Sequence, residues 1–241
     1  MTRIFLSPED ISSDIVTITD DQARHLTLVL RAKPSDMISV LNGSGYEYKC
    51  RIVSVHKKEV KAEVISKGPY SAESPVSITV AQGISKGERM DIAIQKSTEL
   101  GATRIVPVIT ERSQVKHTQK VERWHKIALS AAQQSGRDKI PEINEPVRLE
   151  EFLDSIVTGS PGIIFFEEKR ERNLKDILSG FQEIKELIIL IGPEGGFTKE
   201  EVAAATEKGF IEASLGPRIL RTETAPITAL SIIQYELGDM G

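Results

Sequence analysis

Cysteine is nearly absent from this chain of 241 residues, which contains only Cys50. One cysteine excludes an internal disulfide and any zinc or iron–sulfur site built from several cysteines. The four histidines are scattered without the spacing of metal ligands, so no metal is expected. The longest apolar stretches, such as residues 187–191, are far shorter than the roughly 20 residues of a membrane-spanning helix. The first residues also lack the apolar core of a signal peptide. These absences predict a soluble, cytoplasmic protein with no membrane partner.

Net positive charge is missing as well, because 31 Lys and Arg stand against 35 Asp and Glu. An acidic total argues against nucleic acid as a partner, but the charge is unevenly distributed. Residues 112–139 contain seven Lys or Arg and two acidic residues, which gives this segment a charge of +5. Such a patch can engage phosphate at close range, although a run of charge is more commonly a solvated face.

The first 66 residues have the pattern of a small β-barrel. Short segments of alternating or β-branched residues predict strands, and residues 42–45 (NGSG) predict a hairpin turn between two of them. One helix is expected, with Asp20 as its N-cap. The predicted strands cover residues 3–6, 14–19, 37–41, 47–55 and 59–65, and the predicted helix covers residues 21–30.

Residues 67–75 are rich in Gly, Pro and Ser and are predicted to be a linker, which divides the chain into domains at 1–72 and 73–241. Beyond the linker, strands alternate with helices, a pattern typical of a mostly parallel sheet covered on both faces. Topology rules alone favour an open Rossmann-like sheet, because threaded chains are rare. The strands are expected at residues 76–81, 104–109, 163–166, 187–191 and 212–215, and the helices at 88–100, 119–134, 198–208 and 225–237.

Three segments near the C-terminus follow predicted strands, where open parallel sheets bind ligands. Residues 190–197 form a glycine turn between a strand and a helix, and Thr198 and Glu201 have the spacing of a capping box. Residues 213–220 contain a Gly-Pro turn, and residues 221–226 open the last helix. The turn matches neither a P-loop nor a dinucleotide fingerprint. An ordinary strand-to-helix turn and a helix cap with an ion pair remain the alternatives.

Several motifs carry a family resemblance along almost the whole chain. They are KGERM at residues 86–90, QKSTELG at 95–101, ERS at 111–113, QSGR at 134–137, IGPEGGF at 191–197 and LGPRILRTETA at 215–225. With these motifs the chain resembles the bacterial 16S ribosomal RNA (uracil-N3) methyltransferases, a family of the SPOUT superfamily. The last two motifs are the most specific.

The resemblance implies an α/β fold in which a PUA-like N-terminal β-barrel precedes a SPOUT-type methyltransferase domain with a C-terminal trefoil knot. It also implies S-adenosylmethionine as cofactor, 16S rRNA of the small ribosomal subunit as partner, and a homodimer formed through the knot helices, including residues 225–237. The cofactor would be held by three loops, through Leu190, Ile191, Gly192, Pro193, Gly195, Gly196, Leu215, Gly216, Ile219, Leu220, Thr224 and Ala225.

Methylation of uracil N3 requires loss of an imide proton and stabilisation of the charge that develops on the base. Arg221 is the candidate to face that charge. Either Glu223 or Glu194 could accept the proton or position Arg221, and the sequence does not choose between them. The candidates for RNA contact are Arg3, Arg24, His25, Arg31, Lys86, Arg89, Arg112, Ser135 and Arg137.

Two alternative functions stay open at this point. One is a different knotted RNA methyltransferase that acts on a ribose 2′-oxygen or on transfer RNA. The other is a non-catalytic RNA-binding assembly factor, against which the intact RTETA motif at residues 221–225 argues.

Overall fold

The computed structural model describes residues 2–7, 10–12, 14–116, 118–157, 159–166, 174–181 and 183–241. The chain divides into two compact units. The first contains Met1–Ala72 together with Ala132–Lys139, and the second contains Glu73–Ala131 and Ile140–Gly241. The sequence did not suggest that residues 132–139 group with the first unit. The domain boundaries at 1–72 and 73–241 stay a prediction.

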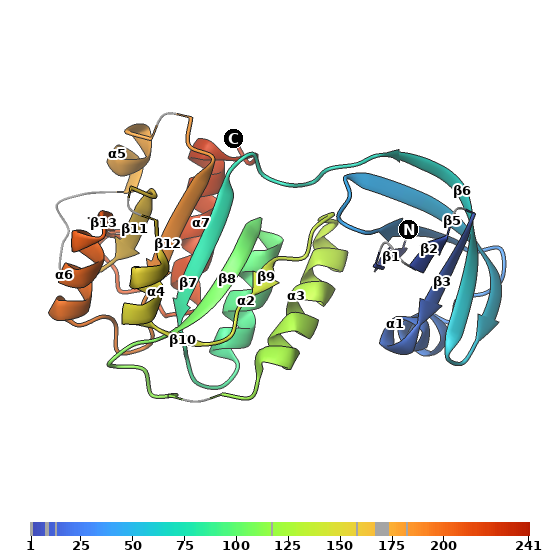
Figure 1. The fold of residues 1–241 in the computed structure, drawn as a ribbon, viewed down its shortest axis with the longest axis horizontal. Helices are drawn as coiled ribbons and strands as arrows, with labels where there is room; N and C mark the ends of the chain where they lie inside the picture. Colours follow the sequence, from blue (N-terminus) through green and yellow to red (C-terminus); the bar gives the residue numbers. More distant parts are fainter. Residues whose placement is uncertain are drawn as a thin grey trace. The chain divides into compact units, whose positions relative to one another are not determined.

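A mixed sheet forms the first unit (Figure 1). Its six strands, among the described residues, follow the order β1-β4-β5-β6-β3-β2, with β1 parallel to β4 and the other pairs antiparallel. The predicted hairpin turn at residues 42–45 connects β4 to β5. The strands are β1 (Thr2–Phe5), β2 (Ile11–Ser12), β3 (Ile15–Thr19), β4 (Met37–Leu41), β5 (Tyr46–His56) and β6 (Glu59–Pro69).

The core of the first unit contains Cys50, which is fully buried. Burial raises the pKa of its thiol to about 11, so the side chain behaves as a small apolar residue. Two local expectations were wrong. Asp20 is the first residue of helix α1 (Asp20–Arg24), with Thr19 at the N-cap, and the chain continues as a π-helix, η2 (His25–Val29). The predicted linker begins too early, because β6 extends to Pro69 and pairs with Tyr46.

The second unit contains a parallel sheet with the order β10-β8-β7-β12-β11-β13, and β9 pairs with β8. All of its strand pairs are parallel, as the strand–helix alternation predicts. The strands are β7 (Ser77–Gly83), β8 (Ala102–Ile109), β9 (Glu142–Ile143), β10 (Val147–Arg148), β11 (Gly162–Phe165), β12 (Glu186–Ile191) and β13 (Phe210–Ala213).

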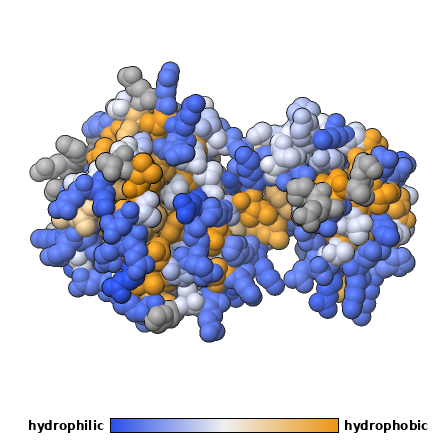
Figure 2. Space-filling view, viewed as in Figure 1, coloured by the Kyte–Doolittle hydropathy of each residue, from blue (hydrophilic) through white to orange (hydrophobic). Residues whose placement is uncertain are grey.

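Helices cover both faces of this sheet (Figure 1), and each face has its own apolar core. Strand β12 shows why: Ile189 packs in one core and Leu190 in the other, as expected for a strand buried on both sides. Hydrophilic residues cover much of the visible surface (Figure 2). The first core involves α2 (Arg89–Glu99), α3 (Val121–Ser135), α5 (Leu174–Ser179) and α7 (Thr224–Leu237), and the second involves α4 (Leu149–Ser155) and α6 (Lys199–Glu207).

The segment after β13 leaves the edge of the sheet and returns to its middle. Thr222, in this segment, hydrogen-bonds to the loop that follows β12 and to Gln82 at the end of β7. An open Rossmann-like sheet has no such return, so topology rules alone would have given the wrong arrangement. None of the helices among the described residues combines the length and apolar character of a membrane span. Within the same residues, no three His, Cys, Asp or Glu side chains group as metal ligands.

Candidate active site

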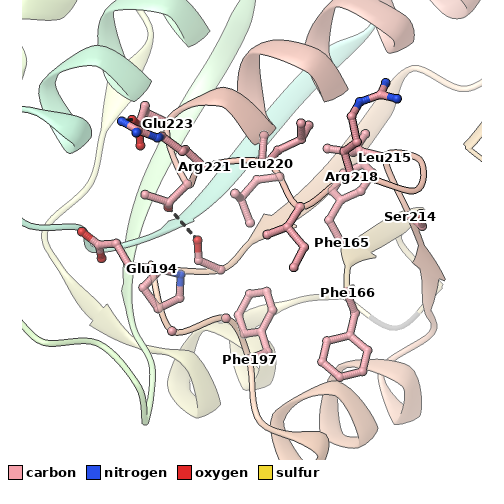
Figure 3. A pocket seen from close by; sticks show the side chains of 18 of the residues that line it. Phe165, Phe166, Glu194, Phe197, Ser214, Leu215, Arg218, Leu220, Arg221 and Glu223 are labelled. Atoms are coloured by element: carbon pink, nitrogen blue, oxygen red, sulfur yellow. Dashed lines mark hydrogen bonds and ion pairs between the residues drawn. The ribbon is translucent and has the colours of Figure 1, made fainter. Parts of the chain in front are cut away.

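A pocket opens at the carboxyl ends of β11, β12 and β13, the edge at which parallel sheets bind ligands. Its volume is about 670 Å³, within the range of about 300–1,000 Å³ that is usual for small-molecule sites. Most of its wall comes from residues 191–197, after β12, and from residues 213–223, after β13. Figure 3 shows the side chains from these loops converging on one cavity.

The turn after β12 is fixed by the capping box that follows it and by hydrogen bonds from Arg112. The capping box of Thr198 and Glu201 forms as the sequence predicts and sets the start of α6. Gly196 has φ of +67°, a conformation that favours glycine. Arg112 Nη1 donates hydrogen bonds to the carbonyl oxygens of Gly195 and Phe197, at 3.1 and 3.2 Å. The backbone of the turn therefore has a fixed shape in which its polar groups can face a ligand.

One side of the pocket is apolar and aromatic. Phe165 and Phe166, at the end of β11, lie there with Leu215, while Phe197 forms the adjoining wall (Figure 3). Ile219 also lines the pocket and leaves 75% of its surface exposed. Apolar surface of this kind can cover the flat face of a ligand ring.

The other side is charged, with Glu194, Arg221 and Glu223 drawn together in Figure 3. Arg89 Nη1 lies 2.7 Å from Glu194 Oε1, and Arg89 Nε lies 3.9 Å from Glu223 Oε2. Arg221 Nη1 is 4.0 Å from Glu223 Oε1, yet 81% of the Arg221 side chain is exposed. Burial would raise the pKa of Glu194, but hydrogen bonds from its own backbone, from Arg89 and from the Lys86 N–H outweigh it and lower the pKa.

Buried hydrogen bonds connect the pocket loops to the sheet. The Thr222 hydroxyl donates to the Gly192 carbonyl oxygen at 2.8 Å and accepts from Gln82 Nε2 at 3.2 Å. Ser85 Oγ lies 3.1 Å from the same hydroxyl. One side chain thus joins the loops that follow β7, β12 and β13, and so fixes the backbone on two sides of the pocket.

Replacing Thr222 by valine is expected to lower the free energy of unfolding by about 1–3 kcal/mol, because buried polar groups lose their partner. Urea denaturation measures the change. Thr206→Val is the matched control, since the Thr206 hydroxyl bonds only to the Val202 carbonyl oxygen of its own helix among the described residues. Equal losses in both variants would contradict a joining role for Thr222.

The structure brings together most of the residues that the sequence proposed for the cofactor. All of them line the pocket except Leu190 and Thr224, and Leu190 is fully buried in a core. The catalytic candidates Glu194, Arg221 and Glu223 line it too. Phe165 and Phe166 are not among the sequence candidates, because no local pattern shows which strand end faces the loops; Phe197 lies in the predicted 190–197 turn but was assigned no role there. Arg89, a candidate for RNA contact in the sequence, contacts two carboxylates of the pocket.

The other RNA candidates fall in both units. In the second, Lys86 and Arg112 are exposed, although one Arg112 nitrogen is engaged by the glycine turn. In the first unit Arg137 is only 3% exposed, which leaves little surface for a phosphate, so a direct contact does not fit its burial. Among the candidates in that unit, Arg24, His25, Arg31 and Ser135 are exposed and Arg3 is half-buried.

Comparison with known proteins assigns the family. Residues 72–234 match the model of the RNA methyltransferase domain, and residues 18–65 match the RNA methyltransferase PUA domain. Ribosomal RNA small subunit methyltransferase E of Bacillus subtilis is 36% identical over 91% of this chain and 90% of its own length. The chain belongs to the ribosomal RNA small subunit methyltransferase E family. The family resemblance read from the motifs is therefore confirmed, as is the α/β fold with a PUA-like domain and a SPOUT-type methyltransferase domain.

Two similar proteins have been solved with the methyl donor bound. Ribosomal RNA small subunit methyltransferase E from Neisseria gonorrhoeae, bound to S-adenosyl methionine, is 38% identical, with a TM-score of 0.92 over the full length of both chains. A protein from Legionella pneumophila, solved in complex with the same cofactor, is 37% identical, with a TM-score of 0.91 over 99% of this chain and 98% of its own. The pocket described here fits that donor, because glycine-rich backbone and apolar walls enclose a space of suitable volume.

Proposed function

We propose that this protein is an S-adenosylmethionine-dependent methyltransferase that methylates N3 of a uridine in 16S rRNA of the small ribosomal subunit. The observation that carries the proposal is the pocket at the ends of β11, β12 and β13. The pocket has the volume and lining of a donor site. At one side the exposed Arg221 lies beside Glu223, and Arg89 contacts both Glu194 and Glu223. A ribosomal RNA substrate implies action in the cytoplasm.

The donor would be held by residues 191–196 and 215–220, whose backbone N–H and carbonyl groups can hydrogen-bond to its polar edges. Leu215, Ile219 and Leu220 supply the apolar walls. When bound, S-adenosylmethionine supplies an electrophilic methyl group on a positively charged sulfur. The two carboxylates at the charged side favour that positive charge by simple attraction.

The chain's own residues must make N3 of uracil nucleophilic. This nitrogen is a protonated imide, and loss of its proton spreads negative charge over N3, O2 and O4. The exposed guanidinium of Arg221 is available to face that charge, because its only ion pair among the described residues is the 4.0 Å approach to Glu223. Arg221 is accordingly the residue proposed to stabilise the reacting base.

N3 lies on the pairing edge of uracil, so the target base must be unpaired or turned out before it reacts. Recognition then depends on phosphate contacts and on the shape around a splayed base. Lys86 and Arg112, exposed in the second unit, and Arg24, His25 and Arg31, exposed in the first, are the proposed contacts. Binding is expected to weaken steeply as salt concentration rises.

A homodimer is part of the proposal. Helix α7 begins directly at the pocket loop, and Tyr235 on this helix is 63% exposed. A second copy packed on α7 would cover this side chain and brace the loop that carries Arg221. Sedimentation of the purified protein measures its mass in solution, and a monomer at all concentrations would contradict this part.

The deciding experiment uses small ribosomal subunits from a strain that lacks the gene for this protein. The subunits are incubated with the protein and isotopically labelled S-adenosylmethionine. Mass spectrometry of the nucleosides, followed by mapping of the modified base, should find N3-methyluridine in 16S rRNA. A ribose 2′-O-methyl product, or label only in transfer RNA, would instead assign a different methyltransferase reaction. Calorimetry that detects no binding of the donor would favour a non-catalytic assembly factor.

A further inference from the structure

Arg89 connects two carboxylates that are far apart in the sequence. It is the first residue of α2, and its guanidinium contacts Glu194 after β12 and Glu223 before α7. The arginine side chain is 46% exposed, whereas Glu194 and Glu223 are only 19% and 14% exposed. One arginine thus pairs with two carboxylates whose side chains are mostly covered, at the charged side of the pocket.

The two carboxylates differ in the hydrogen bonds that they accept. Glu194 Oε1 accepts from Arg89 Nη1 at 2.7 Å and from the Lys86 backbone N–H at 3.0 Å. These bonds favour the ionised form, consistent with the lowered pKa of Glu194, and make it a poor proton acceptor. Glu223 Oε2 is buried and accepts no hydrogen bond from any residue that the structure describes.

An oxygen with an unused lone pair is what a general base needs. The charged groups that face Glu223 are Arg89 from α2 and Arg221 from its own loop, at 3.9 and 4.0 Å, and Glu194 shares Arg89 from the opposite loop. Both contacts to Glu223 are longer than a hydrogen bond, so they orient the carboxylate without occupying its lone pairs.

We propose that Arg89 is a positioning residue that fixes Glu194 as its ionic partner and leaves Glu223 as the carboxylate that accepts the uracil N3 proton. The N3–H bond breaks and the proton passes to Glu223. The electron pair left on N3 forms the new bond to the methyl carbon, and the pair of the broken carbon–sulfur bond stays on sulfur. This inference rests on the proposed function and assigns roles within the same site.

The test compares Glu223→Gln with Glu194→Gln in rate profiles from weakly acidic to alkaline pH. Glu223→Gln is expected to lose about a hundredfold in rate at neutral pH and to regain rate at alkaline pH, where solvent removes the N3 proton. Glu194→Gln is expected to lose no more than about tenfold, since the general base remains. A larger loss in Glu194→Gln, with recovery at alkaline pH only there, would overturn the assignment.

Arg89 variants separate positioning from general structural support. Arg89→Ala should lower the single-turnover rate and leave the affinity for S-adenosylhomocysteine unchanged, because Glu223 loses one of the two cations that orient it. Arg89→Lys keeps the charge and should recover part of the rate. Equal rates in Arg89→Ala and Arg89→Lys would overturn the positioning role. Arg148→Ala is the control, because Arg148 forms an exposed ion pair with Glu150 and does not line the pocket.

Unfolding measurements test the pairing of Arg89 with Glu194 without an activity assay. Urea unfolding of Arg89→Ala, Glu194→Gln and the double variant should show non-additive losses, so that the double variant unfolds near the midpoint of Arg89→Ala. Additive losses would overturn the proposed pairing. Calorimetry with S-adenosylhomocysteine verifies that each variant keeps its pocket. If wild-type protein makes no N3-methyluridine, the proposed function fails; if it does and the two glutamine variants behave alike, only this inference fails.

Discussion

Arg221→Ala is expected to lower the rate of methyl transfer to small ribosomal subunits about 100- to 1,000-fold, the usual cost of removing one group that stabilises developing charge. The side chain is 81% exposed and makes no closer ionic contact than 4.0 Å among the described residues, so little of the fold depends on it. Its loss should therefore appear in turnover. Single-turnover assays with labelled donor measure the chemical step directly.

Donor binding is the internal control for this variant. The affinity for S-adenosylhomocysteine, measured by calorimetry, should stay within about threefold of the wild-type value, a difference below 1 kcal/mol. Arg218→Ala is the matched variant, because Arg218 is an exposed arginine of the same loop that lies at the other side of the pocket (Figure 3). An equal loss of rate in both variants would show that positive charge in general, and not the position of Arg221, matters.

The fold could be predicted largely from local patterns. Strand β4 begins and ends where the sequence places it, and the capping box of Thr198 and Glu201 starts α6 as expected. The missed helices are short: α4 and α5 span seven and six residues, too few for an apolar period to stand out. Asp20 has φ of +54°, an uncommon conformation that no sequence rule assigned to it.

The site was only half predictable for a different reason. Its loops carry glycine turns that local chemistry identifies, whereas its charge network joins residues that are distant in the sequence. Arg89 and Glu194 are 105 positions apart, and only the parallel sheet order brings α2 next to the loop after β12. Arg112 likewise resembles a surface cation in the sequence, yet it fastens the glycine turn. Charge alone therefore does not distinguish an RNA contact from a residue that shapes the pocket.

Gly83→Ala is expected to damage the donor site without altering any group that touches the substrate. Gly83 ends β7 and is buried directly against the loop after β12. A Cβ atom at this position would lie 2.4 Å from the Pro193 backbone nitrogen and 2.8 Å from the Gly192 carbonyl carbon. Backbone atoms of a sheet and of a fastened turn cannot move away cheaply, so the loop must shift. The free energy of unfolding should fall by about 1–3 kcal/mol.

Affinity for S-adenosylhomocysteine should fall in the same variant by at least about tenfold, or 1.4 kcal/mol, because Gly192 and Pro193 form part of the pocket wall. Gly68→Ala is the matched control: Gly68 also lies in a strand, and a Cβ atom there would meet no atom within 4 Å among the described residues. That variant should unfold within about 0.5 kcal/mol of wild type and bind the ligand normally. Normal binding by Gly83→Ala would mean that the contact between β7 and the Gly192 turn does not set the shape of the donor site.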